Sequence, residues 1–358
     1  MAALAAVSCR RPRGSGFAGY CFVANGEGRS LAAVDLSSFA VTRQIALEGR
    51  PAAVISHPTE PLVYVLGTAG VAEVEARSLK IRRRVRLEGG ARAAFEAGGA
   101  LWVLEERALV KLPLESLKAA ARIRLPMAAG GFDVTRDGKM AAVRFAGEGA
   151  VAVVNLQERG LRLVALGSAA DRVLFRPDGR QLLVGSLAAR RLTVVDAAGL
   201  EVVVHLPLPI EPDNFCFNSD GGQLFVTGAG MDAVTIVFPY STEVAETVLA
   251  GKGPGAMAVC RSPGGGEYLF VANPEAGDVT VLEIETRKMV AVLQAGREPR
   301  HITITPDQQY CLVLNRRSGD LTVIRVAALA ARQKKYPAPL FTVIPVGREP
   351  LSAAVVRV

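Results

Sequence analysis

Short apolar segments recur along the chain at a nearly fixed interval, and this repetition limits the possible folds more than any other feature. The central valines of eight such segments lie 42, 38, 40, 41, 42, 45 and 42 residues apart. These valines are Val23, Val65, Val103, Val143, Val184, Val226, Val271 and Val313. A period of about forty residues over nearly the whole chain indicates a repeat architecture.

Each repeat has the same internal order of strand-like segments. An apolar segment such as Pro299 to Thr305 follows a Gly/Pro turn, and a turn such as Arg176-Pro-Asp-Gly179 leads into the valine segment. An alternating segment such as Leu192 to Asp196 and a fourth such as Val41 to Leu47 complete the unit. Four antiparallel strands in about forty residues form one blade of a β-propeller. Helical repeats are excluded, because β-branched residues alternate with period two and Gly or Pro interrupts the pattern about every ten residues.

We therefore predict an all-β fold, a β-propeller of about eight four-stranded antiparallel blades that occupies residues 1–358 as a single domain. Seven blades is the alternative, and it requires the least typical repeat, around Leu101 to Leu125, to merge with a neighbour. That repeat has Glu96-Ala-Gly-Gly99 where others have the Pro-Asp-Gly turn. A short insertion is expected at about residues 327–340, where Ala327 to Lys335 is typical of helical or irregular structure.

The two ends of the chain together offer one first strand too many. Leu4 to Cys9 resembles a first strand and so does Leu351 to Val358, yet only eight second strands exist to receive them. Gly347-Arg-Glu-Pro350 is identical to Gly296-Arg-Glu-Pro299, so the turn that introduces a first strand is present before the C-terminal segment. We predict that residues 351–358 form the innermost strand of the blade built from residues 17–47, and that this pairing closes the ring.

Composition bears on the class and the compartment of the protein. Half of the residues are hydrophobic, but the apolar runs are short and fall well below the ~20 residues of a membrane-spanning helix, so no membrane insertion is expected. Arg10, Arg11 and Arg13 follow the N-terminal apolar stretch, whereas a secretory signal has its basic residues first. We expect a cytoplasmic protein, with a periplasmic or exported one as the alternative if the start is truncated. The five cysteines lack the spacing of metal or haem-attachment motifs.

Several of these segments resemble one known repeat family. Phe22-Val-Ala-Asn25 and Phe270-Val-Ala-Asn273 end in Asn, third strands have the form Leu-Thr-Val-Val-Asp, and Gly-x-x-Pro precedes first strands. Over about residues 17–358 these features resemble the YVTN-type β-propeller repeats of bacterial and archaeal proteins. The resemblance implies the propeller fold. That family includes surface-layer, periplasmic and binding proteins as well as relatives of lactonases and of haem-carrying nitrite reductases.

Motifs that carry catalysis are missing from the sequence. It contains no nucleophile elbow, nucleotide-binding glycine loop, zinc-protease motif or calcium loop, and three histidines are too few for a multi-histidine metal site. We therefore predict no catalytic residue, no metal and no cofactor. His57 is expected in a turn and His205 on an outer strand, where structural or solvent-facing roles are typical.

One group of polar residues remains as a candidate site. In a propeller the first strand of each blade lines the central channel, and the residues after the Gly-x-x-Pro turn lie at the channel mouth, where ligand sites are usually built. We predict that any small-molecule site lies at this mouth. Its candidate ligand-binding residues are Arg92, Asp171, Arg172, Asp213, Asn214, Arg300 and His301. The alternative is a solvated rim whose charges pair with one another.

The net charge of +8 permits an acidic partner such as nucleic acid. Aromatic residues make up only 6% of the chain, which argues against a base-stacking surface. Arg82, Arg84 and Arg86 alternate on one face of an outer strand, a pattern that protects a sheet edge from pairing with another molecule. Nucleic acid is therefore the weaker expectation.

Two functional hypotheses follow from these observations. The first is a non-enzymatic, monomeric binding or scaffold propeller whose partner is an unidentified protein or small molecule. The alternative is a lactonase-like hydrolase or a haem-binding propeller that uses the Arg, His and Asp residues at the channel mouth.

Overall fold

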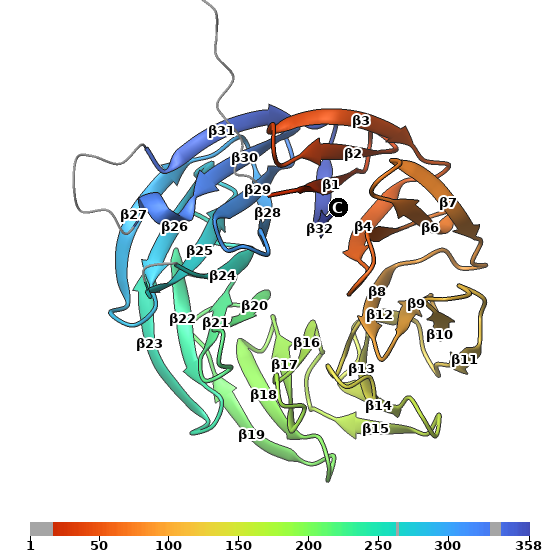
Figure 1. The fold of residues 1–358 in the computed structure, drawn as a ribbon. Coiled ribbons are helices and arrows are strands. Elements are labelled where there is room, and N and C mark those ends of the chain that lie inside the picture. Colours follow the sequence, from red (N-terminus) through yellow and green to blue (C-terminus); the bar gives the residue numbers. More distant parts are fainter. Residues whose placement is uncertain (1–16, 263–264, 330–337) are drawn as a thin grey trace, which may run out of the picture.

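Four-stranded antiparallel sheets surround a central axis, and each sheet has one edge toward that axis (Figure 1). The structure is a computed structural model that describes residues 17–262, 265–329 and 338–358. Eight sheets are present in these residues, so the prediction of eight blades is confirmed and the alternative of seven is wrong. This arrangement is a β-propeller.

Each blade runs from an inner strand at the axis to an outer strand at the outer surface, and the blades are numbered from the N-terminal end. Blade 1 contains β32 (Pro350–Arg357), β1 (Gly19–Asn25), β2 (Ser30–Asp35) and β3 (Ala40–Ala46). Blade 2 contains β4 (Pro51–Ser56), β5 (Leu62–Gly67), β6 (Gly70–Glu75) and β7 (Lys80–Val85). Blade 3 contains β8 (Ala93–Ala97), β9 (Ala100–Leu104), β10 (Ala108–Pro113) and β11 (Ala121–Arg124). Blade 4 contains β12 (Ala129–Val134), β13 (Met140–Phe145), β14 (Ala150–Asn155) and β15 (Leu161–Ala165).

The other four blades repeat this order. Blade 5 contains β16 (Arg172–Phe175), β17 (Gln181–Ser186), β18 (Arg191–Asp196) and β19 (Val202–Pro207). Blade 6 contains β20 (Asn214–Phe217), β21 (Leu224–Thr227), β22 (Ala233–Phe238) and β23 (Glu243–Leu249). Blade 7 contains β24 (Met257–Arg261), β25 (Glu267–Asn273), β26 (Asp278–Glu283) and β27 (Lys288–Gln294). Blade 8 contains β28 (Pro299–Ile304), β29 (Tyr310–Asn315), β30 (Asp320–Arg325) and β31 (Leu340–Pro345).

The position of each strand in its blade explains its residue pattern. Second strands such as β5 are buried along their whole length, because neighbouring blades cover both of their faces. Outer strands such as β7 alternate between exposed and half-buried residues, as expected at a solvated edge. The hydrophobic clusters lie between blades: one cluster joins Val23 and Val34 of blade 1 to Leu312 and Val323 of blade 8.

Blade 3 is a complete sheet even though its repeat is the least typical. Gly98 and Gly99 connect β8 to β9, with φ angles of +60° and +71°. Two positive φ values are what a tight two-residue hairpin turn requires, and glycine adopts them without strain. The glycine pair therefore takes the place of a longer turn such as Arg176-Pro-Asp-Gly179 of blade 5. Trp102 fills the resulting core and is 2% exposed.

The C-terminal strand closes the ring as predicted. β32 pairs with β1 in antiparallel register from Gly19 opposite Arg357 to Asn25 opposite Pro350 (Figure 1). The competing segment Leu4 to Cys9 lies outside the described residues.

The predicted insertion falls between the third and fourth strands of blade 8. A 3-10 helix, η1 (Val326–Ala328), begins there and β31 starts at Leu340. Residues 330–337 lie outside the described part of the chain.

Deleting residues 351–358 removes the strand that closes the ring and uncovers the inner edge of β1. Because Ala353, Ala354 and Val356 are buried, the loss amounts to several kcal/mol, and we expect the melting temperature to fall by about 10 °C or more. Thermal unfolding followed by circular dichroism measures this. Deleting residues 1–9 is the control and should change little; the reverse order of effects would contradict closure of the ring by β32.

Candidate ligand-binding site at the channel mouth

All first strands start at the same end of the ring, and this end is the channel mouth. The turns that precede them, which we call rim turns, lie there; before β24, β28 and β32 they have the form Gly-x-x-Pro. Three first strands begin with a β-bulge whose extra residues are Ala52, Gly130 and Arg300, and β32 has an equivalent irregularity at Leu351. A bulge re-aims the side chain of its extra residue. The rim turns and bulges together present side chains from several blades to one opening.

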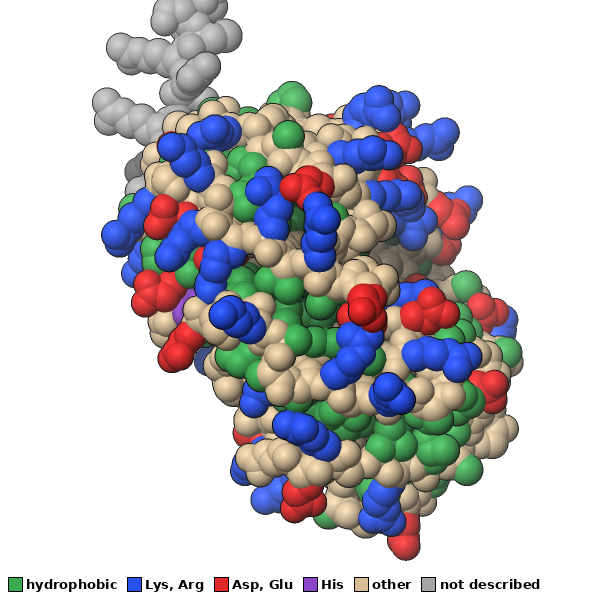
Figure 2. All heavy atoms as spheres, turned by 90° about the vertical axis from the view of Figure 1, so that its right-hand side faces the viewer, with side chains coloured by type: hydrophobic (Ala, Val, Ile, Leu, Met, Phe, Trp, Pro, Cys, Tyr) green, Lys and Arg blue, Asp and Glu red, His purple; other side chains and the backbone are tan. Residues whose placement is uncertain are grey.

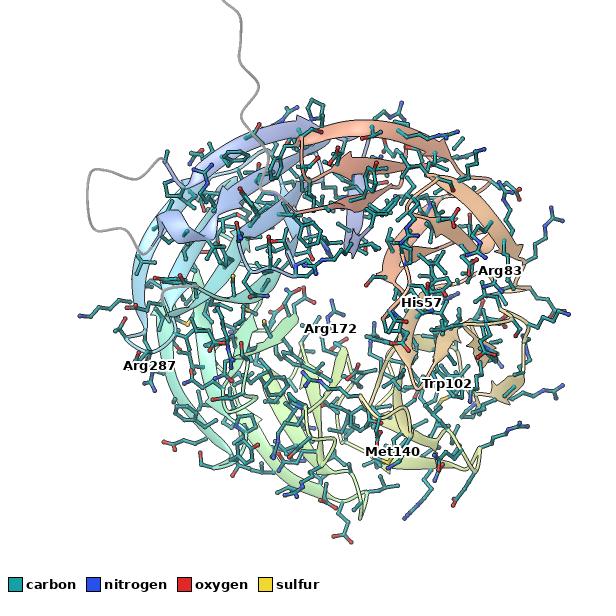
Figure 3. The ribbon with its side chains drawn as sticks, in the orientation of Figure 1. His57, Arg83, Trp102, Met140, Arg172 and Arg287 are labelled. Atoms are coloured by element: carbon teal, nitrogen blue, oxygen red, sulfur yellow. The ribbon has the colours of Figure 1, made fainter. Side chains whose placement is uncertain are left out.

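Arg172 and Asp213 connect blades 5 and 6 at this mouth. The Arg172 guanidinium donates hydrogen bonds to the backbone carbonyl and to Oδ1 of Asp213, and Asn214 Nδ2 donates to the other carboxylate oxygen at 3.3 Å. Figure 3 shows Arg172 on the inner side of the ring, in contrast to Arg83 and Arg287 on the outer side. Asp171 is engaged within its own blade, where its Oδ2 accepts a hydrogen bond from the Leu187 amide at 2.8 Å.

Two of the open hollows at the mouth are lined by predicted site residues. One of about 360 Å³ is lined by Arg50, Arg92 and Leu351 among others. The other, of about 240 Å³, is lined by Asp213, Asn214, Glu275 and Arg300 among others. Arg92 also pairs with Glu106 at 3.2 Å, and both side chains are more than half exposed. Four of the seven predicted site residues thus line these hollows.

Arg144 is a mouth residue that reasoning from first strands missed. It lies on the second strand of blade 4, opposite Gly131, and its Nη2 donates to the carbonyl oxygen of Gly130 at 2.6 Å. A Cβ atom on Gly131 would lie 3.0 Å from Arg144 Nε, and one on Gly130 would also meet the guanidinium. The two glycines therefore make room for this side chain. Burial and the neighbouring charge of Arg172 lower the pKa of Arg144.

A sequence signal for Arg144 exists in the alignment of second strands. At the equivalent position the other blades have Ala24, Leu66, Leu104, Gly185, Thr227, Ala272 and Leu314. Arg144 is the single charged residue at this aligned position, and it lies opposite two glycines. This combination indicates that its side chain fills the space that a side chain of the first strand fills in other blades.

His301 joins two blades. Its Nε2 accepts a hydrogen bond from the Ala353 amide at 3.2 Å, which links β28 of blade 8 to the closing strand β32. Burial lowers the pKa of His301 to about 4, and the donated N–H requires an unprotonated Nε2. His301, a predicted ligand-binding residue, therefore uses its Nε2 in a hydrogen bond between two blades of the ring. His57 accepts two amide hydrogen bonds in its turn, and His205 lies on outer strand β19, as expected.

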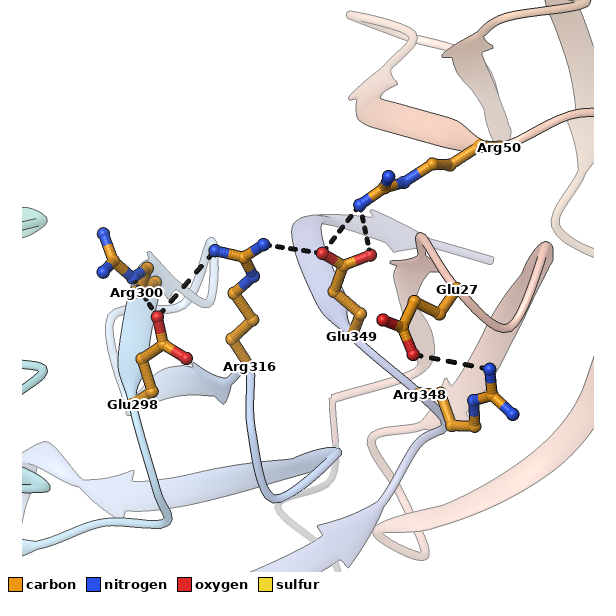
Figure 4. A network of polar contacts seen from close by, with 7 residues as sticks. All are labelled: Glu27, Arg50, Glu298, Arg300, Arg316, Arg348 and Glu349. Atoms are coloured by element: carbon orange, nitrogen blue, oxygen red, sulfur yellow. Dashed lines mark hydrogen bonds and ion pairs between the residues drawn. The ribbon is translucent and has the colours of Figure 1, made fainter.

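A chain of alternating charges crosses the mouth where the ring closes (Figure 4). Arg300 Nε donates to Glu298 at 2.6 Å, Arg316 lies 3.8 Å from the same carboxylate, and Arg316 also bonds to Glu349 at 2.7 Å. Arg50 bonds to both oxygens of Glu349. Burial alone would raise the pKa of Glu349, but these hydrogen bonds from Arg316 and Arg50 lower it. The chain links blades 8, 1 and 2.

Basic residues also lie on the outer surface. Figure 2 shows Lys and Arg side chains spread over one outer side, with fewer acidic ones between them. Arg82 and Arg84 alternate along β7, and they form ion pairs with Glu73 and Glu48 respectively. These residues fit the predicted protected sheet edge.

Other reactive groups of the described residues are buried or isolated. Burial raises the pKa of Cys21, Cys216 and Cys260 to about 12 each. Within residues 17–262, 265–329 and 338–358, no cluster of three or more His, Cys, Asp or Glu side chains has the arrangement of a metal site. The same residues contain no helix of the length and apolarity needed to cross a membrane.

Comparisons with known proteins support the fold. The seven-bladed β-propeller protein Rv1057 of Mycobacterium tuberculosis is 24% identical over 150 residues, which cover 41% of this chain and 38% of that protein. The match therefore spans well under half of the relative. No protein-family model matches the chain, so membership of the YVTN repeat family stays a prediction.

Solved structures share the architecture at low identity. Dihydro-heme d1 dehydrogenase NirN, in complex with DHE, aligns with a TM-score of 0.75 at 16% identity over 97% of this chain and 77% of that one. Kuenenia stuttgartiensis hydrazine synthase aligns with a TM-score of 0.61 at 20% identity, over 77% of this chain and 96% of that one. The Myceliophteria thermophila Cps50 (Swd1) propeller domain aligns with a TM-score of 0.62 at 13% identity, over 80% of this chain and 100% of that one. These likenesses show the fold alone.

The burial of His301 makes ring stability depend on pH. An unfolded histidine binds its proton at a pKa of about 6.5, whereas His301 in the fold resists protonation until about pH 4. The contribution of His301 to the free energy of unfolding is therefore complete above pH 6.5. It is lost as the pH falls toward 4, by at most about 3 kcal/mol. We expect His301→Gln, whose amide oxygen accepts the same bond without titrating, to show a flatter fall in unfolding free energy over this range. Urea titrations at several pH values give the unfolding free energy of each protein. The same fall of this free energy with pH in both proteins would contradict the role of His301.

Proposed function

We propose that this chain is a non-enzymatic binding propeller whose small-molecule ligand occupies the channel mouth. The observation that carries the proposal is the pair of hollows of about 360 and 240 Å³ at that mouth. Polar side chains from blades 2, 3, 6, 7 and 8 line them, and a concave surface with a few convergent polar groups is the usual form of a ligand site.

Binding without chemistry fits the state of the reactive groups. The thiols of Cys21, Cys216 and Cys260 have a pKa of about 12 and so are not nucleophiles at neutral pH. Asp171 and His301 accept hydrogen bonds from backbone amides of the ring itself. Arg172 and Asp213 bond to each other. These groups support positioning of a ligand more than proton transfer or nucleophilic attack.

A metabolite screen by thermal shift tests this proposal. A stabilising compound should lose affinity in Arg92→Ala, which alters one hollow, or in Asn214→Ala and Arg300→Ala, which alter the other, and should keep it in the outer-edge control Arg82→Ala. Mass spectrometry should recover the compound unchanged after incubation. Equal affinity in all variants would place the ligand elsewhere, and release of a product would show that the chain is an enzyme.

A further inference from the structure

The guanidinium of Arg144 differs from the other mouth arginines in its partners. Arg50, Arg92, Arg172 and Arg300 each have a carboxylate within 4.0 Å. None of the ion pairs formed by the described residues includes Arg144, which instead donates a hydrogen bond to a backbone carbonyl. It is only half-buried, so its remaining N–H donors are available at the mouth.

The backbone of blade 4 is adapted to hold this side chain. Gly130 is the extra residue of the β-bulge at the rim, at the point where blades 2 and 8 have Ala52 and Arg300. Without a Cβ at residues 130 and 131, the Arg144 side chain lies over the first strand. A guanidinium in this position is restrained before any ligand arrives, which lowers the entropy cost of binding.

Strand β16, which carries Arg172, packs beside β13, which carries Arg144. The charge of Arg172 lowers the pKa of Arg144, and the charges of Asp171 and Asp213 act in the opposite direction. Arg172 is already paired with Asp213, whereas Arg144 has no carboxylate partner among the ion pairs of the described residues, so Arg144 is the cation that an incoming anion can bind. Guanidinium groups bind carboxylate and phosphate oxygens through paired N–H donors.

We propose that the channel mouth binds a small molecule through an oxyanionic group, a carboxylate or a phosphate, with Arg144 as the anchoring residue and Arg172 beside it. This inference rests on the proposed function and specifies the ligand class of the same mouth. The neighbouring hollow with Asn214 and Arg300 would hold the rest of the molecule.

Thermal-shift titrations at constant ionic strength test the inference with three probes: inorganic phosphate, succinate and the uncharged succinamide. We expect phosphate or succinate, but not succinamide, to raise the melting temperature, and the comparison of the two anions distinguishes a phosphate site from a carboxylate site. Arg144→Gln should weaken anion binding at least about tenfold.

Two matched variants separate a built site from a net-charge effect. Gly130→Ala keeps every charge but its methyl group displaces the guanidinium, so it should also weaken binding. Arg124→Gln removes an exposed arginine of the outer strand β11, and it should bind as the natural chain does. Binding that is insensitive to Arg144→Gln and Gly130→Ala, or that Arg124→Gln reduces equally, overturns the inference, as does the absence of any shift with both anions.

Amide hydrogen exchange distinguishes failure of this inference from failure of the proposed function. Succinamide or another neutral compound that protects amides of β12, β16 and β20 would overturn the oxyanion site and leave a ligand site at the mouth. Protection by every stabilising compound confined to the outer strands would overturn both proposals.

Discussion

The pairing of β32 with β1 is the constraint on which the rest of the molecule depends. A ring of sheets has no independent blade 1 until the C-terminal strand fills its inner position. β32 then bonds sideways as well: Ala353 donates to His301 of blade 8, and Ser352 accepts from the Val54 amide of blade 2 at 3.2 Å. Glu349, just before the strand, binds arginines from the same two neighbours. Closure thus fixes the mouth as well as the ring.

Neighbouring blades are also joined elsewhere by side chains that accept backbone N–H groups. Asp133 of β12 accepts from the Phe175 amide of β16 at 2.6 Å, and burial raises the pKa of this aspartate to about 6. A buried acceptor of this kind fixes blade 5 against blade 4. Arg144 lies on blade 4 and Arg172 on blade 5, so the same contact joins the two blades that carry these arginines.

The repeat pattern predicted the architecture closely because each repeat encodes its own turns and strands. The valine spacing indicated eight blades, and Gly347-Arg-Glu-Pro350 identified the closing strand. The site was harder to predict, since an alignment of first strands alone gives no information on side chains of the second strand that lie over them. Gly130 and Gly131 looked empty in that alignment, yet Arg144 from the next strand occupies their space. His301 occupied a predicted mouth position, but its bond to Ala353 depends on a strand fifty residues away.

Anomalous diffraction from crystals soaked in selenate, an oxyanion with the shape of phosphate, tests the central claim most directly. We predict a selenium peak at the channel mouth with its oxygens within hydrogen-bond distance, about 3 Å, of the Arg144 and Arg172 guanidinium groups. The peak should disappear in Gly130→Ala. Selenate bound only at the outer strands, or at the mouth with equal occupancy in Gly130→Ala, would contradict the oxyanion site.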